Sequence, residues 1–219
     1  VDTETTSLDP LQAKIVGISF SVAANEAAYL PMAHRAPGAP EQLDFDETLA
    51  KLKPWLENPA KLKLGQNLKY DQHVFANHGI ALAGIAHDTL LQSYVLESHK
   101  THNMDDLAQR HLGVTTISYE QVCGKGVRQI GFDEVDVQTA TDYSAEDADI
   151  TLRLHQTLYP QVAADAQLDF IYRQIEMPSR EVLFKIERYG VLIDSQKLQQ
   201  QSHELGQKML ELEQKAHLL

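Results

Sequence analysis

Short apolar strand segments alternate with helical segments along the first 165 residues, and this alternation restricts the chain to a mixed α/β fold. Residues 14–22 (KIVGISFSV) are β-branched and apolar, and residues 26–32 (EAAYLPM) follow as their hairpin partner. Shorter strands are predicted at residues 61–66 and 85–87. Helices are predicted around these strands, at residues 45–58, 67–79, 88–98, 104–113 and 133–160. The sequence therefore predicts a mixed α/β domain that ends near residue 165.

The remainder of the chain carries only helical patterns. Two long helical segments, residues 169–190 and 195–219, surround the short VLID stretch. The second segment has apolar side chains at spacings of three and four, as in a coiled coil: Leu205, Met209, Leu212, Ala216 and Leu219. Two or three heptads are weak support for a dimer. We therefore expect a monomer in which these apolar side chains pack on protein outside this chain. The start within a predicted strand and the end within a predicted helix favour a piece of a longer protein.

Composition excludes several classes of protein. The single Cys123 excludes a disulfide framework and a cysteine-based zinc site, and it is typical of a reducing compartment, so a cytoplasmic location is expected. No apolar run is long enough for a membrane span, and no membrane partner is expected. The net charge of −12 argues against nucleic-acid binding by bulk electrostatics. It is compatible with an enzyme that holds only a strand end and uses bound cations.

Two acids near the start of the chain raise the possibility of a metal site. Asp2 and Glu4 are two positions apart in a predicted strand, so their side chains lie on one face. The spacing alone does not decide, because the composition gives about four acid-x-acid pairs by chance. The sequence holds five such pairs. A metal site therefore needs matching acids elsewhere in the chain.

Two further acids have a suitable context. Asp71 lies in the first turn of a helix that Asn67 is predicted to cap, directly after a strand. Tyr143 and Asp147 are four residues apart on a helix and share one face, while Asp149 is predicted to point away and to be structural. Each acid also has a simpler explanation, since Asp71 could stabilise a helix N-terminus and Asp147 could be a surface acid.

Taken together, these residues resemble a known family. D-x-E on the first strand, N-x-x-x-D at a helix start and Y-x-x-x-D on a late helix are similar to the three motifs of the tyrosine branch of the DEDD exonucleases. The stretches VDTETTSLD, LGQNLKYD, GKG and YSAEDADITL resemble the 3′–5′ proofreading exonuclease domain of bacterial DNA polymerase I, a family A polymerase. IERYGVLID followed by a long helix is similar to the start of that family's polymerase region.

The resemblance implies a fold and a division into domains. Residues 1–165 would be an N-terminally truncated 3′–5′ exonuclease domain with a ribonuclease H-like mixed β-sheet flanked by helices. Residues 166–219 would be the C-terminally truncated helical start of the polymerase domain. The partners implied are the single-stranded 3′ end of DNA and the remainder of the polymerase chain, in a bacterial cytoplasm and near the nucleoid.

The resemblance also implies a mechanism, in which two divalent ions, Mg²⁺ or Mn²⁺, assist hydrolysis of the terminal phosphodiester bond. Asp2 would bridge both ions, Glu4 and Asp147 would complete the site next to the attacking water, and Asp71 would support the second ion. Tyr143 would orient the water. Without cations the four acids repel each other, so raised carboxylate pKa values are expected.

Substrate contacts follow from the same resemblance. Leu8 and Tyr119 match positions that pack on the terminal bases, and Gln66, Asn67 and Tyr70 match positions near the strand's backbone. His102 is interpreted as a structural histidine. Two alternatives stay open at this point: a ribonuclease D-like enzyme that trims RNA 3′ ends, and a catalytically inactive interaction module. The polymerase-like IERYGVLID segment argues against the first, and the intact acids argue against the second.

Overall fold

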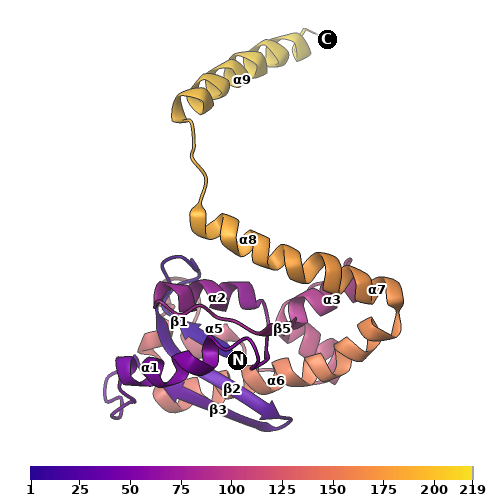
Figure 1. The fold of residues 1–219 in the computed structure, drawn as a ribbon. Helices are drawn as coiled ribbons and strands as arrows, with labels where there is room; N and C mark the ends of the chain where they lie inside the picture. The colour runs from indigo at the N-terminus through magenta and orange to yellow at the C-terminus, as the bar shows by residue number, and fades with distance from the viewer. Residues whose placement is uncertain (219) are drawn as a thin grey trace. The chain divides into compact units, whose positions relative to one another are not determined.

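The computed structural model describes residues 1–218, so Leu219 of the predicted apolar seam lies outside the described residues. The chain divides into two compact units, Val1–Arg188 and Tyr189–Leu219. The first unit contains all five strands and most of the helices (Figure 1). The mixed α/β fold and the strand hairpin predicted from the sequence are confirmed.

Two small sheets form the centre of the first unit. Strands β1 (Asp2–Thr5), β2 (Ile15–Ala23) and β3 (Glu26–Pro31) make an antiparallel sheet in that order. Strands β4 (Lys63–Gly65) and β5 (Ile85–Asp88) form a parallel pair. The backbone nitrogen of Val1 donates to the Leu64 carbonyl at 2.8 Å, which places β4 beside the start of β1. Parallel and antiparallel strands therefore meet at the end of the chain that carries Asp2.

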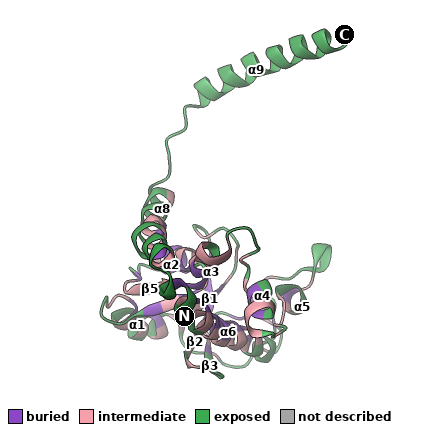
Figure 2. Cartoon of the chain, turned by 90° about the vertical axis from the view of Figure 1, so that its right-hand side faces the viewer, coloured by how far each residue is buried: buried purple, intermediate pink, exposed green. Residues whose placement is uncertain are grey.

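Helices cover the sheet on both sides. On one side β2 packs against α1 (Phe45–Leu56) and α2 (Leu68–Asn77), with Ile18, Leu56 and Phe75 in one apolar cluster. On the other side Val16 and Tyr29 pack against Phe132 and Ala140. The remaining elements of this part of the unit are α3 (Thr89–Glu97), α4 (Met104–Leu107), η1 (Ala108–Leu112), α5 (Tyr119–Cys123), η2 (Gly126–Arg128), η3 (Phe132–Glu134) and α6 (Val137–Ala164). Figure 2 shows the buried residues concentrated between these helices and the strands.

Helix α6 begins and ends four residues later than the sequence pattern predicts. It continues past Pro160 to Ala164, although proline removes one backbone donor from the helix. Leu158 and Val162 on either side of Pro160 are fully buried. Their packing holds the last turn in place, which a local pattern could not reveal.

The start of α2 differs from the prediction in its chemistry. Asn67 occupies the N-cap position, but its backbone has a positive φ of 58° and its side chain makes no capping hydrogen bond. The carboxylate of Asp88, at the end of β5, accepts instead from the backbone N–H groups of Asn67 and Leu68 at 3.0 and 2.9 Å. Asn67 therefore stands at the predicted N-cap position, but its side chain does not cap the helix, because a buried acid from a neighbouring strand accepts these N–H groups.

Two more elements precede α8 in the first unit, α7 (Ala166–Phe170) and η4 (Ile171–Glu176). Helix α8 (Met177–Tyr189) lies along α2 (Figure 1). Glu187 pairs with Lys69 and His73 at 2.5 and 2.8 Å, and Arg180 donates to the Gln72 side chain at 2.7 Å. These contacts attach α8 to the helix that carries Asp71.

In the second unit, α9 (Ser195–Ala216) follows a short irregular stretch, so the two helical segments predicted around VLID are confirmed. Every residue of α9 is exposed (Figure 2). A search of residues 1–218 finds no helix long and apolar enough to cross a membrane.

Candidate active site

Three elements bring the predicted site residues to one cavity of about 590 Å³ in the first unit. Strand β1 contributes Asp2 and Glu4, α2 contributes Asp71, and α6 contributes Tyr143 and Asp147. The cavity wall contains all ten residues singled out from the sequence: Asp2, Glu4, Leu8, Gln66, Asn67, Tyr70, Asp71, Tyr119, Tyr143 and Asp147. The structure thus gathers residues that are up to 145 positions apart, from Asp2 to Asp147.

The acids form a tight cluster. Asp2, Glu4 and Asp147 each offer one carboxylate oxygen, and these oxygens lie within 4.8 Å of one another. Alternation along β1 places Asp2 and Glu4 on the same side of the strand, facing α6. Asp71 lies outside this group of three. Its Oδ1 accepts from the Thr3 backbone N–H at 3.0 Å and from the Thr3 hydroxyl at 2.5 Å.

The cluster holds no balancing cation from the protein's own side chains. Within residues 1–218, no lysine, arginine or histidine forms an ion pair with any of these four carboxylates. Glu4, Asp71 and Asp147 are buried and Asp2 is half-buried, and acids in such a setting without a cationic partner favour the protonated form or an external cation.

The pKa values follow from this arrangement. Burial raises the pKa of Asp2 to about 6. Burial, and then the charge of Asp2, raises the pKa of Glu4 and of Asp71 well above the ordinary carboxyl range. Asp147 has a strongly raised pKa because it is buried and faces Asp2 and Glu4. These directions agree with the expectation from the sequence, but burial contributes more to them than repulsion among the acids.

The donor set fits a divalent metal ion. Asp147 Oδ1 is buried and finds no hydrogen-bond partner in the described part of the chain. A buried charged oxygen without a partner is costly, and a cation would provide one. Carboxylate oxygens are hard ligands of the kind that Mg²⁺ and Mn²⁺ take in proteins. The group Asp2, Glu4 and Asp147 can therefore hold a divalent ion, and Asp71 lines the same cavity.

Tyr143 projects from α6 one turn before Asp147 and contacts the Phe132 ring, with ring centroids 5.8 Å apart. Burial, and then the charge of Asp147, raises the pKa of the Tyr143 hydroxyl far above neutral pH. This phenol therefore stays protonated and can donate a hydrogen bond. Asp149 lies away from the cluster, where it accepts from the Asn25 N–H at 2.5 Å and pairs with Arg153 at 3.2 Å.

The opening of the cavity has an exposed apolar side chain on a loop that a hydrogen bond fixes in place. Leu8 is 91% exposed on the loop after β1. The Tyr70 hydroxyl donates to the Ser7 carbonyl at 2.5 Å and so fixes this loop. Tyr119 from α5 stacks on Phe132, with ring centroids 6.5 Å apart. The site can therefore present an apolar edge and an aromatic ring to planar groups.

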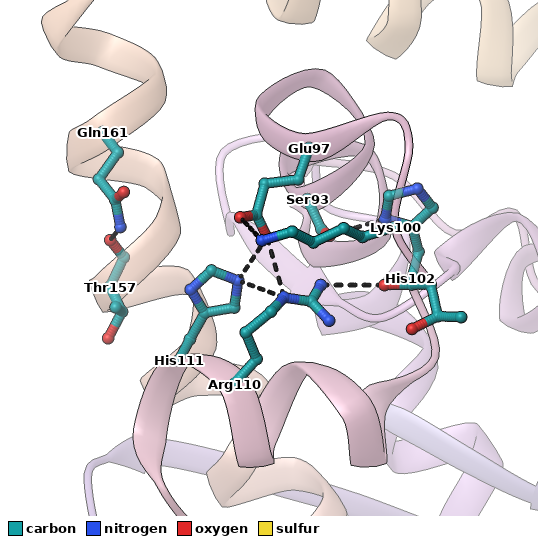
Figure 3. Close-up of polar contacts among 9 residues, drawn as sticks. Ser93, Glu97, Lys100, His102, Arg110, His111, Thr157 and Gln161 are labelled. Carbon is teal, nitrogen blue, oxygen red and sulfur yellow. Dashed lines mark hydrogen bonds and ion pairs between the residues drawn. The ribbon is translucent and has the colours of Figure 1, made fainter.

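A charged cluster holds the loop that carries His102 (Figure 3). Glu97 at the end of α3 accepts from Lys100, Arg110 and His111 at 2.6, 2.9 and 3.1 Å. His102, on the loop between, shares a 2.8 Å hydrogen bond with Ser93, and its carbonyl accepts from Gln66 at 2.9 Å. These contacts agree with a structural role for His102.

Three residues of the site's surroundings escaped the sequence reasoning: Thr3, Ser144 and Asp88. Ser144 donates to Glu4 Oε1 at 2.8 Å, and Thr3 and Asp88 make the contacts given above. A weak signal existed for Ser144, since it lies three positions before Asp147 and so near the same helix face. Thr3 and Asp88 gave no signal, because their partners are distant in sequence.

Comparison with known proteins gives one family. Residues 1–163 match a family model described as 3′-5′ exonuclease. The chain is 52% identical over 219 residues to DNA polymerase I of Pseudomonas aeruginosa, an alignment that takes in 99% of this chain and 24% of that protein. The chain thus spans about a quarter of that relative's length.

Two solved structures share the fold. The POL domain of Pol1 from M. smegmatis, in complex with DNA primer-template and dNTP, matches with a TM-score of 0.70 at 21% identity. That match covers 95% of this chain and 31% of the other. Brucella melitensis NrnC with bound Mg²⁺ matches with a TM-score of 0.58 at 19% identity, over 89% of this chain and 88% of the other. Both similarities agree with the ribonuclease H-like fold that the sequence predicts.

Proposed function

The chain belongs to the 3′–5′ exonuclease family of DNA polymerase I, and on that basis we propose that it removes 5′-mononucleotides from the 3′ ends of DNA strands. In the reaction, water attacks the terminal phosphodiester bond. The products are a 5′-mononucleotide and a strand shortened by one residue with a new 3′ hydroxyl. The observation that carries this proposal is the cluster of Asp2, Glu4 and Asp147, with oxygens within 4.8 Å and no cationic side chain paired to them.

We assign the cluster to two divalent ions, Mg²⁺ or Mn²⁺. Asp2 would hold both, Glu4 and Asp147 would hold the ion nearer the water, and Asp71 would support the second. Two such ions activate water and neutralise charge on both sides of a phosphodiester. The all-oxygen donor set supports this assignment, as does the Mg²⁺ named for the structurally similar NrnC.

Tyr143 would position the water. Its hydroxyl stays protonated because burial and the charge of Asp147 raise its pKa. A neutral donor next to the acids can hold a water molecule in place without removing its proton. Asp147 would then stand next to this water on the same face of α6.

The substrate contacts line the mouth of the same cavity. Leu8 and Tyr119 would pack on the last bases of the strand, and such stacking accepts any base. Gln66, Asn67 and Tyr70 would lie along the sugar–phosphate backbone. A substrate held mainly by stacking near a negatively charged site must bring its 3′ end in unpaired, so single-stranded DNA is the proposed partner.

The proposal extends to the architecture around the site. Residues 1–165 would form the exonuclease domain, and residues 166–219 the helical start of a polymerase domain whose remainder is the second partner. The family match over residues 1–163 and the resemblance to polymerase I support this division. We propose that the chain acts as a monomer in the bacterial cytoplasm, at the nucleoid, in the proofreading that accompanies DNA replication and repair.

A gel assay tests the activity. Oligonucleotides labelled at the 5′ end, in DNA and RNA versions of one sequence, are incubated with the chain in Mg²⁺ or in EDTA. We expect a ladder that shortens from the 3′ end with single-stranded DNA and Mg²⁺, and none with EDTA. Faster degradation of RNA would favour the ribonuclease D-like alternative, and intact DNA in Mg²⁺ would favour an inactive interaction module.

A further inference from the structure

Two buried hydroxyl groups bind the acids of the site from neighbouring elements. The Ser144 hydroxyl on α6 donates to Glu4 Oε1 at 2.8 Å. The Thr3 hydroxyl on β1 donates to Asp71 Oδ1 at 2.5 Å, and the Thr3 backbone N–H donates to the same oxygen at 3.0 Å. Ser144 is fully buried and Thr3 is nearly so. Each hydroxyl thus joins two of the three elements that build the cavity.

Each of these carboxylates has a protein donor at only one of its two oxygens. Glu4 Oε1 and Asp71 Oδ1 have protein donors, whereas Glu4 Oε2 and Asp71 Oδ2 accept from no protein group among residues 1–218. A carboxylate with both oxygens satisfied by protein donors would be a poor ligand, and a carboxylate with neither held could rotate. The last torsion of an acid side chain is broad, so a single donor restricts it markedly.

We propose that Thr3 and Ser144 are positioning residues, which hold one oxygen of Asp71 and of Glu4 so that the other oxygen is presented to a divalent cation. The inference rests on the proposed function, because it assigns to these hydroxyls the outer layer of the same metal site. Partners of this kind orient the ligands, and their removal generally costs about 10- to 100-fold in metal affinity or activity.

Ser144 and Thr3 differ in how much of the hydrogen bonding to their acid depends on the hydroxyl. Ser144 is the single protein donor to Glu4 within the described chain, so Ser144→Ala leaves that carboxylate free to turn. Thr3→Val removes the hydroxyl but keeps the backbone N–H bond to Asp71. The loss of Mn²⁺ affinity is therefore expected to be larger for Ser144→Ala than for Thr3→Val.

The experiment measures Mn²⁺ binding to the whole chain by isothermal titration calorimetry after removal of metal, together with the Mg²⁺ concentration that half-activates the nuclease. Ser144→Ala is expected to raise the Kd for Mn²⁺ by about 10-fold or more. Thr3→Val is expected to raise it by less, and Thr3→Ser, which keeps the hydroxyl, is expected to restore wild-type binding. At saturating Mg²⁺ the rate should recover most of its loss, since the acids themselves are intact.

A matched control separates positioning from stability. Ser93 is also fully buried, and its hydroxyl makes a 2.8 Å hydrogen bond to His102, away from the acids. Ser93→Ala should lower the melting temperature without changing the Kd for Mn²⁺. An unchanged Kd in Ser144→Ala, in a wild-type chain that degrades DNA with Mn²⁺, would overturn the positioning role and leave the proposed function standing. A wild-type chain that neither binds Mn²⁺ nor degrades DNA would overturn both.

Discussion

Glu4 and Glu97 are the same side chain in opposite electrostatic settings. Glu97 accepts from Lys100, Arg110 and His111, and these contacts, the Lys100 hydrogen bond above all, lower its pKa to about 2 (Figure 3). Glu4 is buried next to Asp2 and accepts only from the Ser144 hydroxyl, and its pKa is raised well above the ordinary range. The Glu97 cluster contains its own cationic side chains, whereas the acid cluster has no cationic side chain paired to it within residues 1–218.

The two clusters differ in whether their charges are balanced by neighbouring side chains. The Glu97 cluster fixes the loop that carries His102, so its charges are balanced within the fold. The acid cluster at the cavity has no such balance, so the burial of its acids lowers the stability of the fold, as expected for the metal site that we propose. Helix α2 repeats the contrast, since Lys69 and His73 pair with Glu187 while Asp71 has no cationic partner within residues 1–218.

The largest expected effect is on catalysis. Asp2→Ala should lower the rate of 3′-end degradation by at least about 100-fold, the scale expected when a main source of charge stabilisation is removed. Glu97→Gln should leave the rate close to wild type. Both rates are measured as mononucleotide release from single-stranded DNA in Mg²⁺. Near-normal activity of Asp2→Ala would contradict the assignment of the cavity.

Metal binding should stabilise the fold through the acids. An ion that binds only the folded chain adds about 2.7 kcal/mol at a concentration 100-fold above its Kd. For a chain of this size each kcal/mol raises the melting temperature by about 2–4 °C. Asp147→Ala should remove most of the shift that Mn²⁺ produces in a thermal melt.

Asp149→Ala is the control for that measurement, because Asp149 contacts Asn25 and Arg153 on another face of α6. It should keep the Mn²⁺ shift. The reverse pattern, with the shift lost in Asp149→Ala and kept in Asp147→Ala, would show that the helix register and the motif assignment are both wrong.

The two clusters should respond with opposite sign to removal of a charge. In EDTA at pH 8, Asp147→Asn relieves repulsion among the acids and should raise the melting temperature. Glu97→Gln removes the negative charge that pairs with Lys100 and Arg110 and should destabilise by about 1 kcal/mol, the upper range for partly exposed ion pairs. Denaturant titration of both variants measures the difference. The comparison fails if both substitutions shift stability in the same direction.

The pH dependence should also differ in sign. Asp2 has its pKa raised from 3.8 to about 6, so in EDTA its contribution to stability is complete below pH 3.8 and is lost as the pH rises through about 6. Glu97 has its pKa lowered from 4.5 to about 2, so its contribution is present above pH 4.5 and is lost as the pH falls through about 2.

Melting temperatures measured at a series of pH values should therefore show that Asp2→Asn becomes increasingly more stable than wild type between pH 4 and 7. The melting temperature of Glu97→Gln should lie below that of wild type by a smaller margin when the pH is below 4. A constant difference between Asp2→Asn and wild type across this range would show that Asp2 has an ordinary pKa in the folded chain.

The sequence predicted the strands and helices because their signals are local. The apolar run at Ile15–Ala23 and the helical spacing of α1 are properties of neighbouring residues, and both elements form where expected. Local signals were least reliable at helix ends. Asn67 looked like a cap, yet Asp88 supplies that contact from 20 positions away.

What the sequence by itself determined is which side chains could do the chemistry and on which face of each element they stand. The two-residue period of β1 pairs Asp2 with Glu4, and the helical period of α6 pairs Tyr143 with Asp147 while turning Asp149 away. These relations depend on backbone geometry alone. They hold before any element packs on another.

Only the tertiary structure decided how close the acids come and what surrounds them. The 4.8 Å spread of the cluster, its lack of a cationic partner within residues 1–218 and its hydroxyl donors depend on how β1, α2 and α6 pack. Ser144 meets Glu4 across 140 positions, and Thr3 meets Asp71 across 68. Contacts at such separations leave no periodic trace in the sequence, because they are fixed by the packing of whole elements and not by the spacing of residues within one.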